Sequence, residues 1–274
     1  MRYLKTGLFI ITAAVFLALP TAYAAEEITI CGTGDSQALL RMLAASYEEE
    51  HPGSKINVPD SIGSKGGIKA TAKGDCELGR VARPIKDSEM KYGLEYKVFA
   101  FSPVVFAVNK SVKKIPGLSG IQVLNIFSGR TTNWKELGGP DMMIKVINRE
   151  PGDSSRSVLM KNLPGFEKIK DPVGIVIEHN TPLTIETIST NKGAIGYIPL
   201  SSVDRAHMRI LKLDGVAPTK YRVWRQEYKP VSPLGIIWKG ELQGLAKSFF
   251  DYLFTSEVQA RISRVGLIPA KLDQ

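Results

Sequence analysis

Apolar positions along this chain recur with two different periods, and their alternation predicts an α/β protein. Short runs rich in Val and Ile, bounded by Gly, Pro or Asp, are typical of strands, whereas apolar residues spaced three and four apart are typical of helices. In residues 36–51, for example, Leu39, Leu43 and Tyr47 share one helical face, and Pro52 follows shortly after. Strands are predicted at 27–31, 55–58, 78–82, 96–109, 144–148, 193–199 and 230–238, and helices at 36–51, 67–73, 122–128, 154–163, 185–191, 242–254 and 256–265.

The order of these elements predicts two lobes joined by two crossings of the chain. We expect each lobe to be a mainly parallel sheet flanked by helices, because strands and helices alternate in both halves. The first lobe is predicted to comprise residues 25–107 plus 200–274, and the second residues 108–199. The long strand 96–109 is expected to break at Ser102-Pro103, and Trp134 is expected in a turn. Ligands of such folds bind at strand C-termini and helix N-termini, so the cleft between the lobes is the expected site.

Residues 1–24 predict a secretory signal. Two basic residues precede an apolar run over 8–19, and Ala22-Tyr23-Ala24 has the small-x-small pattern of a cleavage site. The run is too short to span a bilayer, which needs about 20 residues. The first cysteine is Cys31, so no lipid-attachment cysteine follows the run. We therefore expect cleavage after Ala24 and a soluble mature protein in the periplasm.

Charge and cysteine content narrow the function only slightly. The formal net charge is +9 and falls to +7, with 34 basic and 27 acidic residues, when Arg2 and Lys5 are removed with the signal. That excess suits small anions but equally serves solubility. The basic residues are scattered along an exported chain, so we expect no nucleic-acid partner. Export would permit a disulfide between Cys31 and Cys76. Cys31 lies near the end of one predicted strand and Cys76 near the start of another, so in parallel neighbours the two would be several residues out of register. A bridge needs Cα atoms about 4.4–6.8 Å apart. The pairing is therefore left open.

Three strand-to-helix turns carry the candidate chemistry. They are residues 32–37 (Gly-Thr-Gly-Asp-Ser-Gln), 61–67 (Ser-Ile-Gly-Ser-Lys-Gly-Gly) and 149–156 (Arg-Glu-Pro-Gly-Asp-Ser-Ser-Arg). Helix N-termini present free amide groups to anions, and arginine adds a bidentate donor for carboxylate or phosphate. Each turn alone is explained by ordinary helix capping. Three such turns together predict a binding site for an oxyanion.

Enzyme motifs do not accompany these turns. The three histidines, His51, His179 and His207, lack a metal-ligand spacing such as H-E-x-x-H, and the chain contains no G-x-S-x-G nucleophile motif. We therefore expect a binding protein that is not an enzyme and that needs no metal or cofactor.

The same motifs carry a family resemblance. The chain resembles the periplasmic phosphate-binding proteins of ABC phosphate importers, which have the type II solute-binding fold. The matching segments are 28–34, 64–70, 82–85, 149–156, 193–197, 230–234, 246–253 and 266–270, and together they extend over nearly all of the mature chain. The resemblance implies a monomer that closes its two lobes on inorganic phosphate or a similar oxyanion and delivers it to a membrane ABC permease. The alternative is a sensing or signalling protein that uses the same fold to report the oxyanion to a membrane receptor.

Carried over by position, the resemblance implies a set of ligand-binding residues from all three turns. These are Ser36 and Gln37, then Ser64, then Arg149, Asp153, Ser154 and Ser155. Two positions depart from the family pattern. Ala82 stands where the family has Asp or Ser, a group that hydrogen-bonds the ligand, and Asp153-Ser154-Ser155 stands where it has Ser-Gly-Thr.

Asp153 admits three interpretations. An ionised carboxylate only accepts hydrogen bonds, so Asp153 could accept the proton of a hydrogen phosphate, replace the group missing at Ala82 and exclude fully ionised sulfate. Alternatively, Asp153 caps the helix and points away from the cleft. In the third interpretation, the altered turn binds a different ligand.

Overall fold

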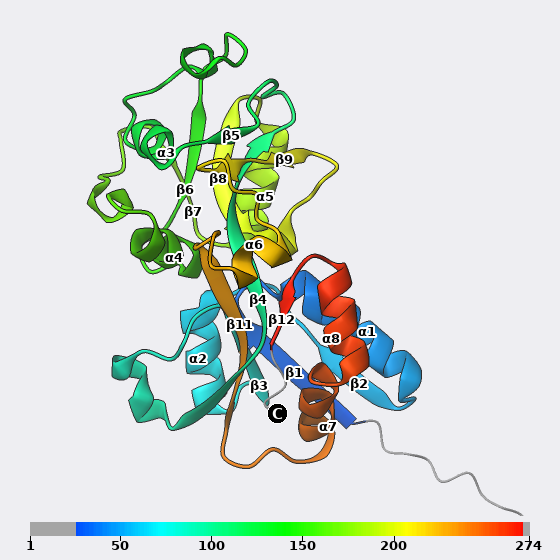
Figure 1. Ribbon diagram of the computed structural model, residues 1–274. Coiled ribbons are helices and arrows are strands. Elements are labelled where there is room, and N and C mark those ends of the chain that lie inside the picture. Colours follow the sequence, from blue (N-terminus) through cyan, green and yellow to red (C-terminus); the bar gives the residue numbers. More distant parts are fainter. Residues whose placement is uncertain (1–25, 271–274) are drawn as a thin grey trace, which may run out of the picture.

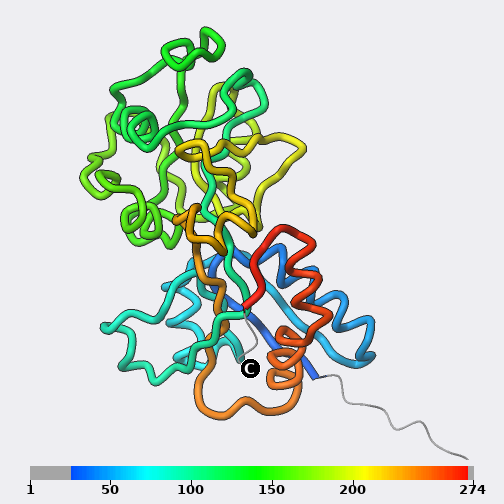
Figure 2. The backbone as a smooth tube through the Cα atoms, viewed as in Figure 1, coloured from blue at the N-terminus to red at the C-terminus, as the bar shows by residue number. Residues whose placement is uncertain are grey.

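The computed structural model describes residues 26–270, so the predicted signal over 1–24 lies outside the described residues. The chain forms two lobes, one above the other in the ribbon view (Figure 1). Strand β4 (Leu94–Asn109) runs through both lobes, and β11 (Val231–Lys239) lies beside it up to the junction (Figure 1). The tube view shows the same two crossings without the ribbons (Figure 2).

The sheet combines parallel ends with an antiparallel centre. Its order is β2-β1-β3-β11-β4-β8-β6-β7, with β9 and β12 also pairing with β4. Pairs within the ends, such as β1 with β2 and β6 with β8, are parallel, whereas β11 and β4 pair antiparallel. The expected fold class of two mainly parallel lobes is therefore confirmed. The remaining strands are β1 (Glu26–Gly32), β2 (Ser54–Asn57), β3 (Leu78–Val81), β6 (Lys145–Arg149), β7 (Val176–Glu178), β8 (Ala194–Pro199), β9 (Met208–Ile210) and β12 (Ile268–Pro269), together with the separate pair β5 (Gly117–Leu118) and β10 (Lys212–Leu213).

The predicted break in the long strand is wrong. β4 is continuous over Leu94–Asn109 and contains both Ser102 and Pro103. Pro103 pairs with Val231, the first residue of β11, and the next residue, Val104, begins the pairing with β8. Proline lacks the N–H that a ladder needs. It is tolerated here because it lies where β4 changes partners.

The helices flank the two ends of the sheet. Helices α1, α2, α7 and α8 belong to the lower lobe of Figure 1, α3, α4 and α5 to the upper lobe, and the short α6 lies at the junction. Three of them begin earlier than predicted, α2 and α5 by four residues and α3 by two. In α2, Gly66 and Gly67 weaken the helical pattern at its start. Their bounds are α1 (Gln37–Glu50), α2 (Gly63–Lys73), α3 (Gly120–Phe127), α4 (Ser154–Asn162), α5 (Thr181–Thr190), α6 (Lys220–Trp224), α7 (Gly244–Leu253) and α8 (Ser256–Arg264). Trp134 begins a short 3₁₀ helix and is fully buried.

Two main clusters of buried apolar side chains form the cores of the lobes. One contains residues from 28–100 and 234–267, including Leu40 and Phe249. The other contains residues from 104–228, including Phe106 and Tyr228. The lobe boundaries predicted from the sequence remain a proposal. We propose moving the second crossing from residue 200 to the start of β11, because residues 208–228 contribute side chains to the second cluster.

The first lobe contains a disulfide between Cys31 and Cys76, whose Cα atoms are 6.1 Å apart. The pairing that the sequence left open forms because β1 and β3 are direct neighbours, with Cys31 opposite Gly79. The turn before β3 places Cys76 beside Cys31 near the end of β1. Across residues 26–270, no helix has both the length and the apolar character that crossing a membrane would require.

Candidate functional site

A pocket of about 380 Å³ lies between the two lobes, where the three predicted turns meet. Two further segments border it, namely the start of α5 and residues 83–89 after β3. The residues that line it are Thr33, Gly34, Ser61, Ile62, Gly63, Ser64, Lys65, Arg83, Lys86, Ser88, Glu89, Arg149, Glu150, Pro151, Gly152, Asp153, Ser154, His179, Asn180 and Thr181.

Arg80, on β3, holds the first turn in place. Its fully buried guanidinium donates to the carbonyl oxygens of Thr33 and Pro59, each at 2.7 Å, and also to Ile30. Burial lowers the pKa of Arg80 to about 10, so the side chain stays charged at neutral pH. The turn is thereby fixed with Thr33 and Gly34 facing the pocket.

The two candidate ligands of the first turn lie behind the pocket wall. Gln37 is buried, its amide nitrogen faces Asp60 at 3.3 Å, and its oxygen accepts from Arg80 at 3.4 Å. The Ser36 hydroxyl is fully buried and has no hydrogen-bond partner among residues 26–270. Neither residue lines the pocket, because the turn presents the two residues that precede Asp35 instead.

Ser64 places a hydroxyl at the second residue of α2, inside the pocket. Its Oγ accepts from the amide of Ala82 at 3.1 Å. The same Oγ lies 3.0 Å from the Oγ of Ser154, which begins α4 in the other lobe. This hydrogen bond joins the lobes directly, so the structure has its cleft closed around the pocket.

Arg149 ends β6 and forms the base of the pocket, with only 3% of its side chain exposed. Its Nε donates to the carbonyl of Glu178 at 3.3 Å and its Nη1 donates to the hydroxyl of Thr181 at 3.2 Å. Its Nη2 forms an ion pair of 2.6 Å with Asp153 Oδ2. The guanidinium is therefore held from three sides, and its Nη2 is paired with the carboxylate of Asp153.

Asp153 lines the pocket and is also the N-cap of α4. Its Oδ1 accepts from the backbone amide of Arg156 at 2.9 Å, while Oδ2 pairs with Arg149. Ser155 is fully buried and does not line the pocket, and its hydroxyl has no partner among the described residues. The second arginine of the turn, Arg156, lies behind the site, where it pairs with Asp171 at 3.2 Å.

Two functional candidates escaped the sequence reasoning, Asp35 and Thr181. Thr181 begins α5 and donates its hydroxyl proton to Asp35 Oδ1 at 2.7 Å, across the cleft. Asp35 is 2% exposed, and its Oδ2 has no hydrogen-bond partner among residues 26–270. Burial, reinforced by the negative charge of Asp153, raises the pKa of Asp35 to about 6. The available signals were the Asn180 cap and Pro182, which together mark the helix start that positions Thr181.

The outer rim of the pocket carries mixed charges. Arg83 and Glu89 form a bidentate pair with both distances at 2.7 Å, and His179 faces Glu150 at 3.1 Å. Lys65 also lies on this rim. Within the described part of the chain, no group of three or more His, Cys, Asp or Glu side chains is arranged to hold a metal ion. The site is therefore suited to an anion held by Arg149, hydroxyls and helix N-termini.

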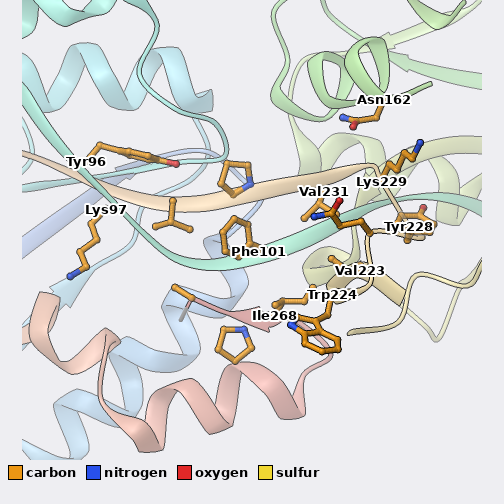
Figure 3. Close-up of a pocket in the computed structure, with 15 residues that line it drawn as sticks. Tyr96, Lys97, Phe101, Asn162, Val223, Trp224, Tyr228, Lys229, Val231 and Ile268 are labelled. Atoms are coloured by element: carbon orange, nitrogen blue, oxygen red, sulfur yellow. The ribbon is translucent and has the colours of Figure 1, made fainter. Parts of the chain in front are cut away.

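A larger hollow of about 1000 Å³ lies beside strands β4 and β11 (Figure 3). Its walls are mainly apolar and include Phe101, Val231 and the exposed Trp224 (Figure 3). Among residues 26–270, neither an arginine nor a carboxylate lines it. The interlobe pocket, although smaller, is the stronger candidate because it concentrates the charged and hydroxyl groups.

Comparisons with known proteins find matches over most of the chain. A PBP superfamily domain matches residues 19–257. The phosphate-binding protein PstS of Bacillus subtilis is 31% identical over 90% of this chain and 81% of its own length. PstS of Borreliella burgdorferi is 25% identical over 89% of this chain and 90% of its own length.

Solved structures show the same architecture. A substrate-binding protein from Clostridium perfringens, assigned to phosphate ABC transport and solved with bound phosphate, has a TM-score of 0.81 and 30% identity. That match covers 90% of this chain and all of the Clostridium chain. A phosphate transport receptor from Vibrio cholerae, at 24% identity and a TM-score of 0.65, shares the fold.

Proposed function

This chain belongs to the PBP superfamily, among the phosphate-binding proteins of ABC importers, and on that premise we propose that it binds inorganic phosphate between its lobes. It then delivers the phosphate to a membrane ABC permease. The periplasm is its proposed location, because the sequence predicts a secretory signal and the relatives are solute-binding proteins. Catalysis has no part in this function.

The observation that carries the proposal is the position of Arg149 at the base of a pocket bordered by two helix N-termini. Ser64 and Ser154 lie at those N-termini, where helix amides without intrahelical partners attract anions. A guanidinium adds charge-assisted bonds, each of about 1.5–3 kcal/mol. Phosphate bound here would replace the direct contact between the two serine hydroxyls and join the lobes itself.

We assign the proposed roles residue by residue. Ser64, Arg149 and Ser154 bind the phosphate oxygens. Asp153 fixes the guanidinium, and the buried Ser155 contributes the helix start. Ser36 and Gln37 support the first turn from behind its wall, where Arg80 donates to the side-chain oxygen of Gln37.

The test is isothermal titration of the ligand-free protein with phosphate and with sulfate, for the wild type and Arg149→Lys. Lysine keeps the positive charge but loses the planar fork of donors. We expect the variant to bind phosphate about 10- to 150-fold more weakly, which corresponds to one charge-assisted bond. Arg205→Lys, on the exposed surface, is the matched control and keeps full affinity. Equal affinity of the Arg149 variant and the control would contradict the proposed site.

A further inference from the structure

Asp35 belongs to the first lobe, but its side chain contacts the second. It lies in the turn between β1 and α1, and its Oδ1 accepts from Thr181 at the start of α5, 146 residues away in sequence. The neighbouring Gly34 has no room for a side chain, because a Cβ there would lie 2.9 Å from Pro182 of the same helix. Asp35 is therefore enclosed only while the lobes are together.

Closure also brings Asp35 close to a second carboxylate. The Thr181 hydroxyl that donates to Asp35 accepts from Arg149, and Arg149 is paired with Asp153 at 2.6 Å. Arg149 from β6 and Asp153 from α4 are the charged groups that act on Asp35, while α5 contributes only the hydroxyl of Thr181. Two buried carboxylates thus share one guanidinium, which leaves one negative charge without a partner.

An unpaired negative charge in a closed cleft favours protonation of the Asp35 carboxylate. The Oδ2 atom of Asp35 is buried and has no hydrogen-bond partner among residues 26–270. Burying an uncompensated charge is costly, and carboxylates that share a site relieve the cost by taking up a proton. The raised pKa of Asp35, about 6 before any anion is present, agrees with this reasoning. A bound phosphate adds negative charge beside Arg149 and increases the tendency to protonate.

We infer that closure of the lobes on phosphate takes up one proton from solvent at Asp35, which releases it when the lobes open. Asp35 is a positioning residue, because it acts on the anion through Thr181 and Arg149. The identity of the anion rests on the proposed function. The coupling itself rests on the contacts between the lobes and applies to closure around any oxyanion.

Titration calorimetry in two buffers of equal pH and different ionisation enthalpy counts the protons taken up per phosphate. Asp35→Asn is the informative variant, because asparagine keeps the oxygen that accepts from Thr181 and cannot ionise. Asp75→Asn, at an exposed position, is the matched control. The ionisation of phosphate itself is common to all three proteins and cancels in the comparison.

We expect the wild type and the control to take up about one proton more per phosphate at pH 7 than Asp35→Asn does. Because one proton is taken up on binding, the affinity of the wild type relative to Asp35→Asn should fall by about tenfold for each unit that the pH rises between about 6 and 7. Equal proton uptake in the wild type and Asp35→Asn would overturn the inference.

A second measurement separates this inference from the proposed function. Small-angle X-ray scattering without any anion reports closure of the wild type at pH 5 and pH 7.5. Compaction at the lower pH in the wild type, absent in Asp35→Asn, supports the coupling even if phosphate does not bind. Identical scattering of the wild type at both pH values would contradict it, whereas failure to bind phosphate would contradict the proposed function alone.

Discussion

Replacing Asp153 with asparagine tests what this carboxylate does in the site. Asparagine is as good an N-cap as aspartate, so α4 should keep its start. The substitution removes the charge that pairs with Arg149 at 2.6 Å and leaves a neutral side chain of nearly the same shape. We expect the guanidinium to become available to the ligand.

The size of the effect follows from the bond that is lost. A hydrogen bond between charged groups contributes about 1.5–3 kcal/mol, and an incoming oxyanion no longer has to compete with it. Phosphate and sulfate should therefore both bind more tightly, by up to about 10- to 150-fold. The ligand-free protein should lose a similar amount of stability, which lowers its Tm by about 3–10 °C for a chain of this size.

Calorimetric titration with both anions, together with thermal unfolding with and without phosphate, measures both effects. The sequence alone also allowed Asp153 to act as the acceptor for the proton of hydrogen phosphate. That hypothesis predicts the opposite outcome, in which the variant binds phosphate more weakly and discriminates less against sulfate. Weaker phosphate binding with an unchanged Tm would refute our reasoning about the ion pair.

Two further predictions concern the closed lobes and the first lobe alone. Gly34→Val should prevent full closure, because the added side chain meets Pro182 and Thr181 of the opposite lobe; we expect a lower phosphate affinity in titration with little change in the free energy of unfolding. Reduction of the Cys31–Cys76 disulfide should lower the free energy of unfolding by up to about 4 kcal/mol, as loop-closure entropy predicts for a separation of 45 residues. Urea unfolding with and without reductant measures this loss, and an unchanged midpoint would contradict it.

Local sequence patterns predicted most of the elements, because each depends on neighbouring residues. The helix 154–163 was predicted from its cap and apolar spacing, and α4 occupies Ser154–Asn162. Errors arose where local signals compete with tertiary structure. Pro103 looked like a strand break, but it lies where β4 exchanges one partner strand for another. No local pattern reveals that exchange.

The site was harder to predict than the fold, and its two Gly-Asp-Ser segments explain why. Gly34-Asp35-Ser36 and Gly152-Asp153-Ser154 are alike in sequence; the first precedes α1, and the second leads into α4, which begins at Ser154. Only Asp153 caps its helix, since α1 begins after Ser36 without a side-chain cap. The side chain of Asp35 instead reaches Thr181 in the other lobe. Its role depends on how closely two separate lobes approach, and spacing within one turn carries no information about that distance.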